Sequence, residues 1–150
     1  DIASWNINIL GTDIADSSIA QACRGTYSNY EIGRGMPPHY LQKYMLREGA
    51  NWKVRDPLRA LVQFERRNLL ESFHDLGPFD VIFCRNVAIY FDPATRRNLF
   101  QRLAERLTPS GYLFVGASES LTDLGPRFAP RMYCRSIFYQ PNIAGQRAST

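Results

Sequence analysis

An apolar run followed at once by polar side chains is the feature of this sequence best suited to bind a ligand. Residues 81–84 are Val, Ile, Phe and Cys, and Arg85, Asn86 and then Tyr90 come after them. Such a run is typical of a strand buried on both faces of a parallel sheet. In open α/β sheets, ligands bind at the carboxyl ends of the strands. Arg85, Asn86 and Tyr90 are therefore predicted to line a binding edge, with a solvated strand end as the alternative.

A second candidate is the carboxylate of Asp13. Residues 5–13 alternate polar and apolar side chains, which predicts a strand that ends at Asp13. Residues 16–18 then offer helix caps, and Gly25 a helix end. A carboxylate between a strand and the following helix can accept hydrogen bonds from both hydroxyls of a ribose. Asp13 is predicted to bind such a ligand or to cap the helix, and the other caps at residues 16–18 favour the first role.

A third pair, Asn68 and Leu69, follows another predicted strand. Residues 61–65 alternate well enough to form it. If this strand joins the same sheet, the pair lies at its carboxyl edge, on the side of Asp13 and Asn86. Three strand ends would then converge on one crevice.

The remaining elements are expected to alternate as in an α/β domain. Tyrosine, glycine and proline interrupt the periodicity between residues 27 and 59, which predicts a small β-subdomain inserted at about residues 40–67. Polar residues 141–150 are predicted to form a flexible tail. The other expected elements are helices at 39–45 and 92–107 and strands at 52–55, 112–116, 132–134 and 136–139.

Composition excludes several classes of protein. With 150 residues, of which 45% are hydrophobic and 21% charged, the chain is typical of one globular domain. No run approaches the roughly 20 apolar residues that span a bilayer, and the first residues lack the layout of a signal peptide. We therefore expect a cytoplasmic location without membrane insertion. The three cysteines form no Cys-x-x-Cys pair and the two histidines stand alone, so no metal site is predicted.

The net charge of +4 permits an anionic partner. Four arginines fall on the helix predicted at residues 92–107. An amphipathic helix keeps one face in water, so these arginines are predicted to form a solvated surface rather than a nucleic-acid site. An acidic protein surface stays open as a partner. The arginines are Arg96, Arg97, Arg102 and Arg106.

Residues 83–92, which read Phe-Cys-Arg-Asn-Val-Ala-Ile-Tyr-Phe-Asp, resemble the catalytic domain of CheR-type chemotaxis receptor methyltransferases. Residues 67–70 (Arg-Asn-Leu-Leu) and 116–121 (Gly-Ala-Ser-Glu-Ser-Leu) extend the resemblance, which runs from Asn8 to Tyr139. It implies an α/β fold, with the Rossmann-like sheet of class I S-adenosylmethionine-dependent methyltransferases. A string this long is far more specific than a single Gly-rich loop.

In that family S-adenosylmethionine donates a methyl group to glutamate side chains on the cytoplasmic helices of bacterial chemoreceptors, leaving S-adenosylhomocysteine. The resemblance implies that Asp13 holds the ribose hydroxyls and that residues 68–69 lie beside the adenine. It also implies that Arg85 and Asn86 border the cofactor and that Tyr90 lies near the methyl group.

The implied chemistry needs no catalytic base. A glutamate side chain in water has a pKa of about 4.3, so it is already ionised at neutral pH. Catalysis must therefore come from alignment and from exclusion of water, to which the hydroxyl of Tyr90 can contribute. The alternative is a non-catalytic, methyltransferase-like module that binds a nucleotide or a signalling protein.

Two features depart from the family's pattern. The family has an N-terminal helical domain and a first strand with a Gly-containing cofactor loop, and this sequence begins after both. Residues 1–150 are thus expected to be a partial catalytic domain, truncated at its N-terminus, inactive alone and able to self-associate through unpaired strand edges. The turn at residues 48–51 is also shorter than the Gly-rich loop with which some members grip a receptor's tether peptide, so tether binding is not expected.

Overall fold

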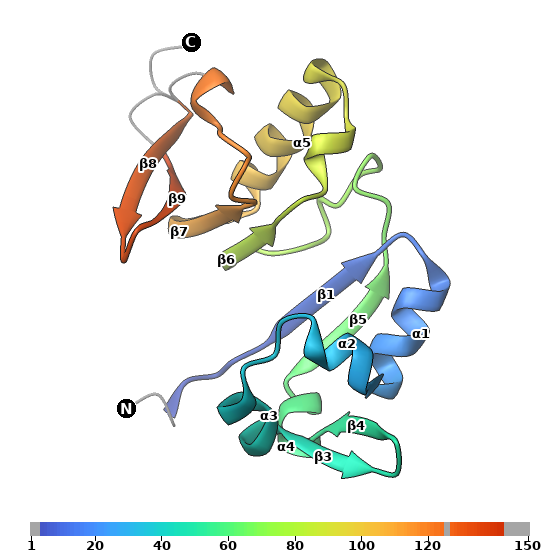
Figure 1. The fold of residues 1–150 in the computed structure, drawn as a ribbon. Helices are drawn as coiled ribbons and strands as arrows, with labels where there is room; N and C mark the ends of the chain where they lie inside the picture. The colour runs from blue at the N-terminus through green and yellow to red at the C-terminus, as the bar shows by residue number, and fades with distance from the viewer. Residues whose placement is uncertain (1–3, 125–126, 143–150) are drawn as a thin grey trace. The chain divides into compact units, whose positions relative to one another are not determined.

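The computed structural model describes residues 4–124 and 127–142, without the side chain of Asp123, and divides into two units (Figure 1). Unit 1 is Asp1–Asn68 and unit 2 is Leu69–Thr150. Each unit contains one pair of parallel strands and one set of antiparallel strands. Helices and strands are interspersed along the chain. The predicted α/β class is confirmed.

The parallel pair of unit 1 consists of β1 (Ile9–Asp13) and β5 (Val62–Arg66). Their register pairs Ile9 with Val62 and Asp13 with Arg66, so both strands end at the same level. Helix α1 (Asp16–Arg24) follows β1 and ends at Gly25, whose φ of 65° is left-handed. The amide of Gly25 donates to the carbonyl of Gln21, which is the C-cap that the sequence predicted.

A small antiparallel sheet in the order β2-β4-β3 lies between β1 and β5 in sequence. The inserted segment was expected at about residues 40–67, but β5 belongs to the other sheet and the small sheet already begins at Thr26. Ser28 and Glu31 form a capping box, a signal by which the helix after β2 could have been found. The elements here are β2 (Thr26–Ser28), α2 (Asn29–Gly33), α3 (Pro38–Tyr44), β3 (Met45–Glu48), β4 (Asn51–Val54) and α4 (Asp56–Arg59).

Unit 2 contains a mixed sheet in the order β6-β7-β9-β8. Strands β6 and β7 are parallel and run in register from Val81–Tyr112 to Cys84–Val115. Strands β8 and β9 form an antiparallel hairpin at one edge, as the sequence predicted. The flexible tail was predicted from residue 141, but Pro141 belongs to β9 and the amide of Asn142 donates to the carbonyl of Arg127 at 2.8 Å, and residues 143–150 lie outside the described part. The elements are β6 (Phe79–Cys84), the 3-10 helix η2 (Ala88–Tyr90), α5 (Pro93–Glu105), β7 (Leu107–Val115), the 3-10 helix η3 (Thr122–Leu124), β8 (Phe128–Tyr133) and β9 (Ser136–Pro141).

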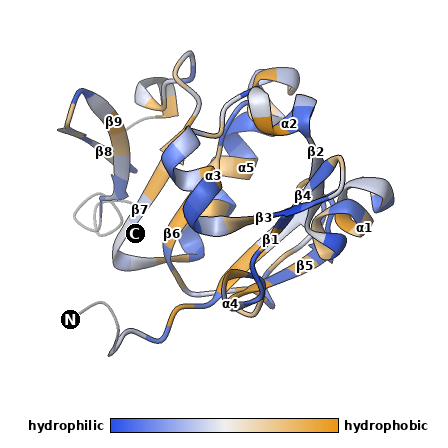
Figure 2. Ribbon diagram, turned by 60° about the horizontal axis from the view of Figure 1, so that its bottom comes forward, coloured by the Kyte–Doolittle hydropathy of each residue, from blue (hydrophilic) through white to orange (hydrophobic). Residues whose placement is uncertain are grey.

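The hydrophobic core of the described residues lies in unit 2, where β6 and β7 are rich in apolar residues (Figure 2). Helix α5 contributes Leu99 and Phe100, both fully buried, and β7 contributes Leu113. Asp92 caps this helix by accepting from the amides of Ala94 and Thr95. In the described part of unit 1, by contrast, Met45 is the only buried hydrophobic residue.

The opposite face of β6 is exposed among the described residues. Val81 is 43% exposed and Phe83 is 71% exposed, although Phe83 stacks on Phe114 with ring centroids 4.9 Å apart. The prediction that β6 is buried on both faces is therefore wrong for the part of the chain that the structure describes. Its apolar run requires a second cover that these residues do not provide.

Candidate functional site

Asp13 is the last residue of β1, and its backbone is held to the end of β5. The amide of Arg67 donates to the carbonyl of Asp13 at 2.9 Å. Nε of Arg66 donates to the carbonyl of Ile14 at 3.0 Å and lies 3.3 Å from Oδ1 of Asp16. The two parallel strand ends are thus tied together by hydrogen bonds just beyond the ladder.

The carboxylate of Asp13 is exposed, and one of its two oxygens has a hydrogen-bond partner. Its Oδ1 accepts from the amide of Ala15 at 2.8 Å. Ala15 is the N-cap of α1 and makes no side-chain cap, so the caps expected at residues 16–18 lie inside the first turn instead. Asp13 therefore performs the local capping role. In the described part of the chain, Oδ2 has no partner and can still accept hydrogen bonds.

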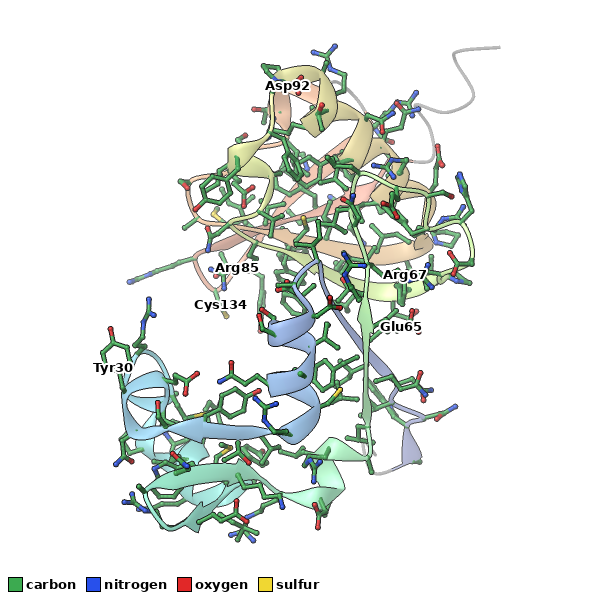
Figure 3. All side chains as sticks on the ribbon, turned by 90° about the vertical axis from the view of Figure 1, so that its right-hand side faces the viewer. Tyr30, Glu65, Arg67, Arg85, Asp92 and Cys134 are labelled. Atoms are coloured by element: carbon green, nitrogen blue, oxygen red, sulfur yellow. The ribbon has the colours of Figure 1, made fainter. Side chains whose placement is uncertain are left out.

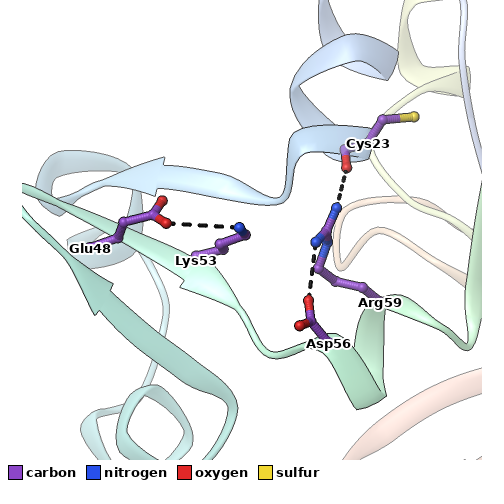
Figure 4. Close-up of polar contacts among 5 residues, drawn as sticks. All are labelled: Cys23, Glu48, Lys53, Asp56 and Arg59. Carbon is purple, nitrogen blue, oxygen red and sulfur yellow. Dashed lines mark hydrogen bonds and ion pairs between the residues drawn. The ribbon is translucent and has the colours of Figure 1, made fainter.

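The C-terminal end of α1 is held by Arg59 of α4 (Figure 4). Its Nη2 donates to the carbonyl of Cys23 at 3.0 Å, and its Nη1 donates to Oδ1 of Asp56 at 3.2 Å. Lys53 and Glu48 form a further ion pair, with N and O 3.8 Å apart, across the β3-β4 pair. Exposed ion pairs contribute little to stability, and of these contacts only the bond from Arg59 to the carbonyl of Cys23 acts on α1.

Asn68 follows β5 at the boundary of unit 1. It is half-buried and comes directly after Arg67, whose side chain returns to Glu65 with Nε 3.0 Å from Oε2 (Figure 3). Asp13 and Asn68 belong to unit 1, and Leu69, Arg85, Asn86 and Tyr90 belong to unit 2.

Leu69 is held in place by Arg102, a residue of α5. Nη2 of Arg102 donates to the carbonyl of Leu69 at 2.7 Å, and Nη1 donates to the carbonyl of Glu71 at 2.6 Å. The guanidinium carbon lies 4.7 Å from the ring centroid of Phe73. The prediction that the arginines of this helix form only a solvated surface is thus wrong for Arg102, because loop carbonyls and an aromatic ring surround it. It is also wrong for Arg106, whose Nη1 donates to the carbonyl of His74 at 2.8 Å.

Arg85 and Asn86 follow β6 directly and are exposed. Asn86 has a φ of 58°, a left-handed conformation that few residues other than glycine adopt. Its amide donates to Oε2 of Glu119 at 2.8 Å, and the amide of Gly116 donates to the same oxygen at 2.7 Å. One carboxylate oxygen therefore joins the ends of the parallel strands β6 and β7.

The surroundings of this carboxylate are crowded and partly apolar. A Cβ atom on Gly116 would lie 2.6 Å from Oε2 of Glu119, so a side chain at this position would displace the carboxylate. Cys84, the last residue of β6, is buried, and burial raises the pKa of its thiol to about 11, with a further contribution from the charge of Glu119. Cys84 is thus a protonated core residue at neutral pH.

Tyr90 ends the 3-10 helix η2 and presents its side chain to solvent. It is 81% exposed, whereas Ala88 in the same turn is fully buried. The amides of Tyr90 and Phe91 donate to the carbonyls of Val87 and Ala88. A buried anchor therefore supports an exposed phenol two residues away, an arrangement that can place a hydroxyl against a ligand.

Two residues that organise these strand ends were missed as site residues from the sequence. Glu119 stands in the segment 116–121 that carries the resemblance, and its position after a predicted strand was the available signal. No such signal marks Arg102, because helical arginines that bind loop carbonyls and helical arginines that face water occur at the same spacing in a sequence.

Other features of the structure lie apart from these residues. A groove of about 550 Å³ in unit 2 is lined mainly by aromatic residues of β7, β8 and β9, and none of the predicted site residues contributes to it. Among the described residues, no group of three or more histidines, cysteines and carboxylates is placed to hold a metal ion. None of the described helices has the length and apolar character needed to cross a bilayer.

Comparison with known proteins identifies the family. Residues 1–133 match the family described as "CheR methyltransferase, SAM binding domain". The chain belongs to this family. The CheR resemblance and the Rossmann-like methyltransferase class predicted from the sequence are thereby confirmed, and S-adenosylmethionine is the cofactor of this family's matched domain.

Curated relatives extend the comparison. The chain is 38% identical over 135 residues to "Chemotaxis protein methyltransferase 1" of Pseudomonas aeruginosa, which covers 89% of the chain and 49% of the relative. It is 42% identical over 124 residues to "Chemotaxis protein methyltransferase 1" of Vibrio cholerae, covering 82% and 45%. The "Chemotaxis protein methyltransferase" of Escherichia coli is 38% identical over 129 residues, covering 82% and 44%. The chain thus spans about half the length of these CheR relatives.

Proposed function

We propose that the protein carrying this chain transfers a methyl group from S-adenosylmethionine to glutamate side chains of bacterial chemoreceptors. The observation that carries the proposal is the family match over residues 1–133, together with relatives about 40% identical that are named chemotaxis protein methyltransferases. The matched region contains all the strand-end residues described above. The expected partners are the cytoplasmic helices of chemoreceptors, and the expected location is cytoplasmic.

The residues present fit the cofactor. Oδ2 of Asp13 is an acceptor without a partner in the described residues, as a ribose diol requires. The backbone at Leu69 is fixed by Arg102, and the turn at Arg85 and Asn86 is fixed by Glu119. We propose that Asp13 holds the ribose, that Asn68 and Leu69 lie beside the adenine, and that Arg85 and Asn86 border the cofactor.

The proposed chemistry relies on alignment. When bound, S-adenosylmethionine supplies an electrophilic methyl group on a sulfonium. A glutamate carboxyl group, whose pKa in water is about 4.3, needs no base to become the nucleophile at neutral pH. The residues of the protein must therefore orient that carboxylate and exclude water from it. We assign Tyr90 to the orientation of the carboxylate, because its side chain is exposed and its backbone is anchored.

Neither nucleic acid nor a receptor tether peptide is a proposed partner. Arg102 lies in α5 and Arg106 is the C-cap of this helix. Both donate to loop carbonyls of their own unit, so these two cations contribute to the fold. The β3-β4 connection is a two-residue turn at Gly49 and Ala50, which is short for a loop that would grip a peptide.

Replacing Asp13 by alanine in the full-length protein should raise the dissociation constant of S-adenosylmethionine about 10- to 100-fold. A lost charge-assisted contact costs roughly 1.5–3 kcal/mol. Isothermal titration calorimetry measures the change. Asp13→Asn is the matched control, because its remaining oxygen can still accept from the amide of Ala15. If both variants bind the cofactor like the wild type, Asp13 serves only as a helix cap.

Activity is tested with radiolabelled S-adenosylmethionine, the full-length protein and a purified cytoplasmic fragment of a chemoreceptor. We expect base-labile label, as glutamate methyl esters give, and no label on a receptor fragment whose candidate glutamates are replaced by alanine. Cofactor binding without transfer to any receptor fragment would instead favour the non-catalytic module. Label that is stable to base would show a different acceptor.

The 150-residue chain on its own should self-associate. Among the described residues, β6 pairs along one edge only, with β7, and its Val81 and Phe83 are exposed. An unpaired apolar edge offers backbone donors and acceptors to another chain. Size-exclusion chromatography with light scattering should show dimers or larger species at about 100 μM, and Phe83→Lys should reduce them because a charge opposes edge pairing. A monomeric wild-type chain at that concentration would contradict the prediction.

A further inference from the structure

Glu119 is placed to control the geometry of a loop that it does not belong to. It lies beyond β7, and its Oε2 accepts from the amides of Asn86 and Gly116 at 2.8 and 2.7 Å. Its own amide donates to the carbonyl of Gly116 at 2.9 Å, which closes a tight turn. The carboxylate is thus fixed to β7 through Gly116 and reaches across to the residue after β6.

The residue that Glu119 holds, Asn86, is in a left-handed conformation. A left-handed backbone costs most residues with a Cβ about 1–2 kcal/mol, and asparagine adopts it more readily than they do, which suits Asn86 to its φ of 58°. A hydrogen bond from an amide to a carboxylate is roughly twice as strong as one between neutral groups. The bond to Oε2 therefore further stabilises this conformation and fixes the direction in which residues 85 and 86 leave β6.

The carboxylate of Glu119 is closely surrounded by its neighbours. A side chain at Gly116 would collide with both the carboxylate of Glu119 and the side-chain amide of Asn86. Oε1 of Glu119 is buried and has no partner among the described residues. A buried carboxylate oxygen without a partner lowers the stability of the fold. The two hydrogen bonds accepted by the other oxygen offset this cost.

We propose that Glu119 is a positioning residue for cofactor binding, acting by holding Asn86 in its left-handed conformation. This inference rests on the proposed function, in which Asn86 borders S-adenosylmethionine. Glu119 need not touch the cofactor, because its effect passes through the backbone of Asn86. A residue that served only stability would lower the melting temperature and leave the affinity of the folded protein unchanged.

The test compares Glu119→Ala, Glu119→Gln and Glu105→Gln in the full-length protein. Glu105 is an exposed glutamate of the same unit and is the matched control. The carbonyl oxygen of glutamine can accept from both amides, so Glu119→Gln should keep the affinity for S-adenosylhomocysteine within about threefold. Glu119→Ala should weaken it at least about tenfold, the effect of one lost bond to a charged group. Calorimetry at a temperature where all variants are folded gives these values.

Amide hydrogen exchange provides a second measurement that does not depend on the cofactor. Exchange at Asn86 and Gly116 should become at least about tenfold faster in Glu119→Ala and stay near the wild-type rate in the other two variants. Wild-type affinity in Glu119→Ala would overturn the positioning role. If the wild type itself binds no S-adenosylhomocysteine, the proposed function fails together with the cofactor part of this inference, and the exchange rates alone decide whether Glu119 holds the turn.

Discussion

Replacing Phe100 by alanine should lower the free energy of unfolding of unit 2 by about 3–5 kcal/mol, as large-to-small changes of a buried phenylalanine do. Phe100 is fully buried on α5 and belongs to the same core as Leu113 of β7. Alanine at this position would leave a cavity in the core of the described residues, and the surrounding side chains can fill it only in part. Urea denaturation followed by circular dichroism measures the loss.

Phe83→Ala is the matched control for that experiment. It removes the same atoms from a side chain that is 71% exposed, and it should cost less than about 1 kcal/mol. Phe100→Leu provides an intermediate case, because leucine fills most of the space that alanine leaves empty. Equal losses at Phe83 and Phe100 would mean that the exposed face of β6 is covered in solution. Both tryptophans, Trp5 and Trp52, lie in unit 1, so their fluorescence reports that unit separately.

Strong local signals made most of the elements predictable. Asp92 and Pro93 mark the start of α5, and the structure shows Asp92 accepting from two amides of the first turn. Gly25 ends α1 in the left-handed conformation that glycine adopts readily. These signals depend on a few neighbouring residues, and so they could be read without knowledge of the rest of the fold.

Signals that depend on distant partners were not readable in the same way. Residues 61–65 were expected to form a strand, but nothing local shows whether that strand joins the inserted sheet or pairs with β1. The prediction that β6 is buried on both faces was wrong for a related reason. An apolar run indicates that both faces need to be covered, but it does not indicate which segment covers them. Strand pairing and the packing of sheet faces are properties of the whole fold.

The candidate site contains residues with local signals and residues whose roles depend on distant partners. Asp13, Arg85 and Asn86 were found because polar residues after a strand follow a rule about sheet edges, and the structure places them directly at the ends of β1 and β6. Their roles toward the cofactor stay predictions. The position of Glu119 after a predicted strand marks it as a candidate, but what it does was not readable from the sequence, because it binds two backbone amides that are far apart along the chain.

Replacing Tyr90 by phenylalanine in the full-length protein should lower kcat for methyl transfer roughly 100-fold, while the dissociation constant of S-adenosylmethionine changes less than about twofold. Removal of one well-placed donor that acts mainly in the transition state has an effect of this size. The hydroxyl of Tyr90 is assigned to align the acceptor carboxylate, and it is 81% exposed, so its loss should not disturb the fold.

Steady-state kinetics with a receptor fragment, combined with calorimetry, separate the two quantities. Tyr133→Phe removes the hydroxyl of another tyrosine of unit 2 that is 74% exposed, and it should leave kcat unchanged. A Tyr90 variant that loses cofactor affinity as strongly as turnover would place the hydroxyl on the cofactor rather than on the acceptor. Unchanged turnover would remove Tyr90 from the reaction altogether. Because the phenol contributes little to packing, either result can be read without correction for unfolding.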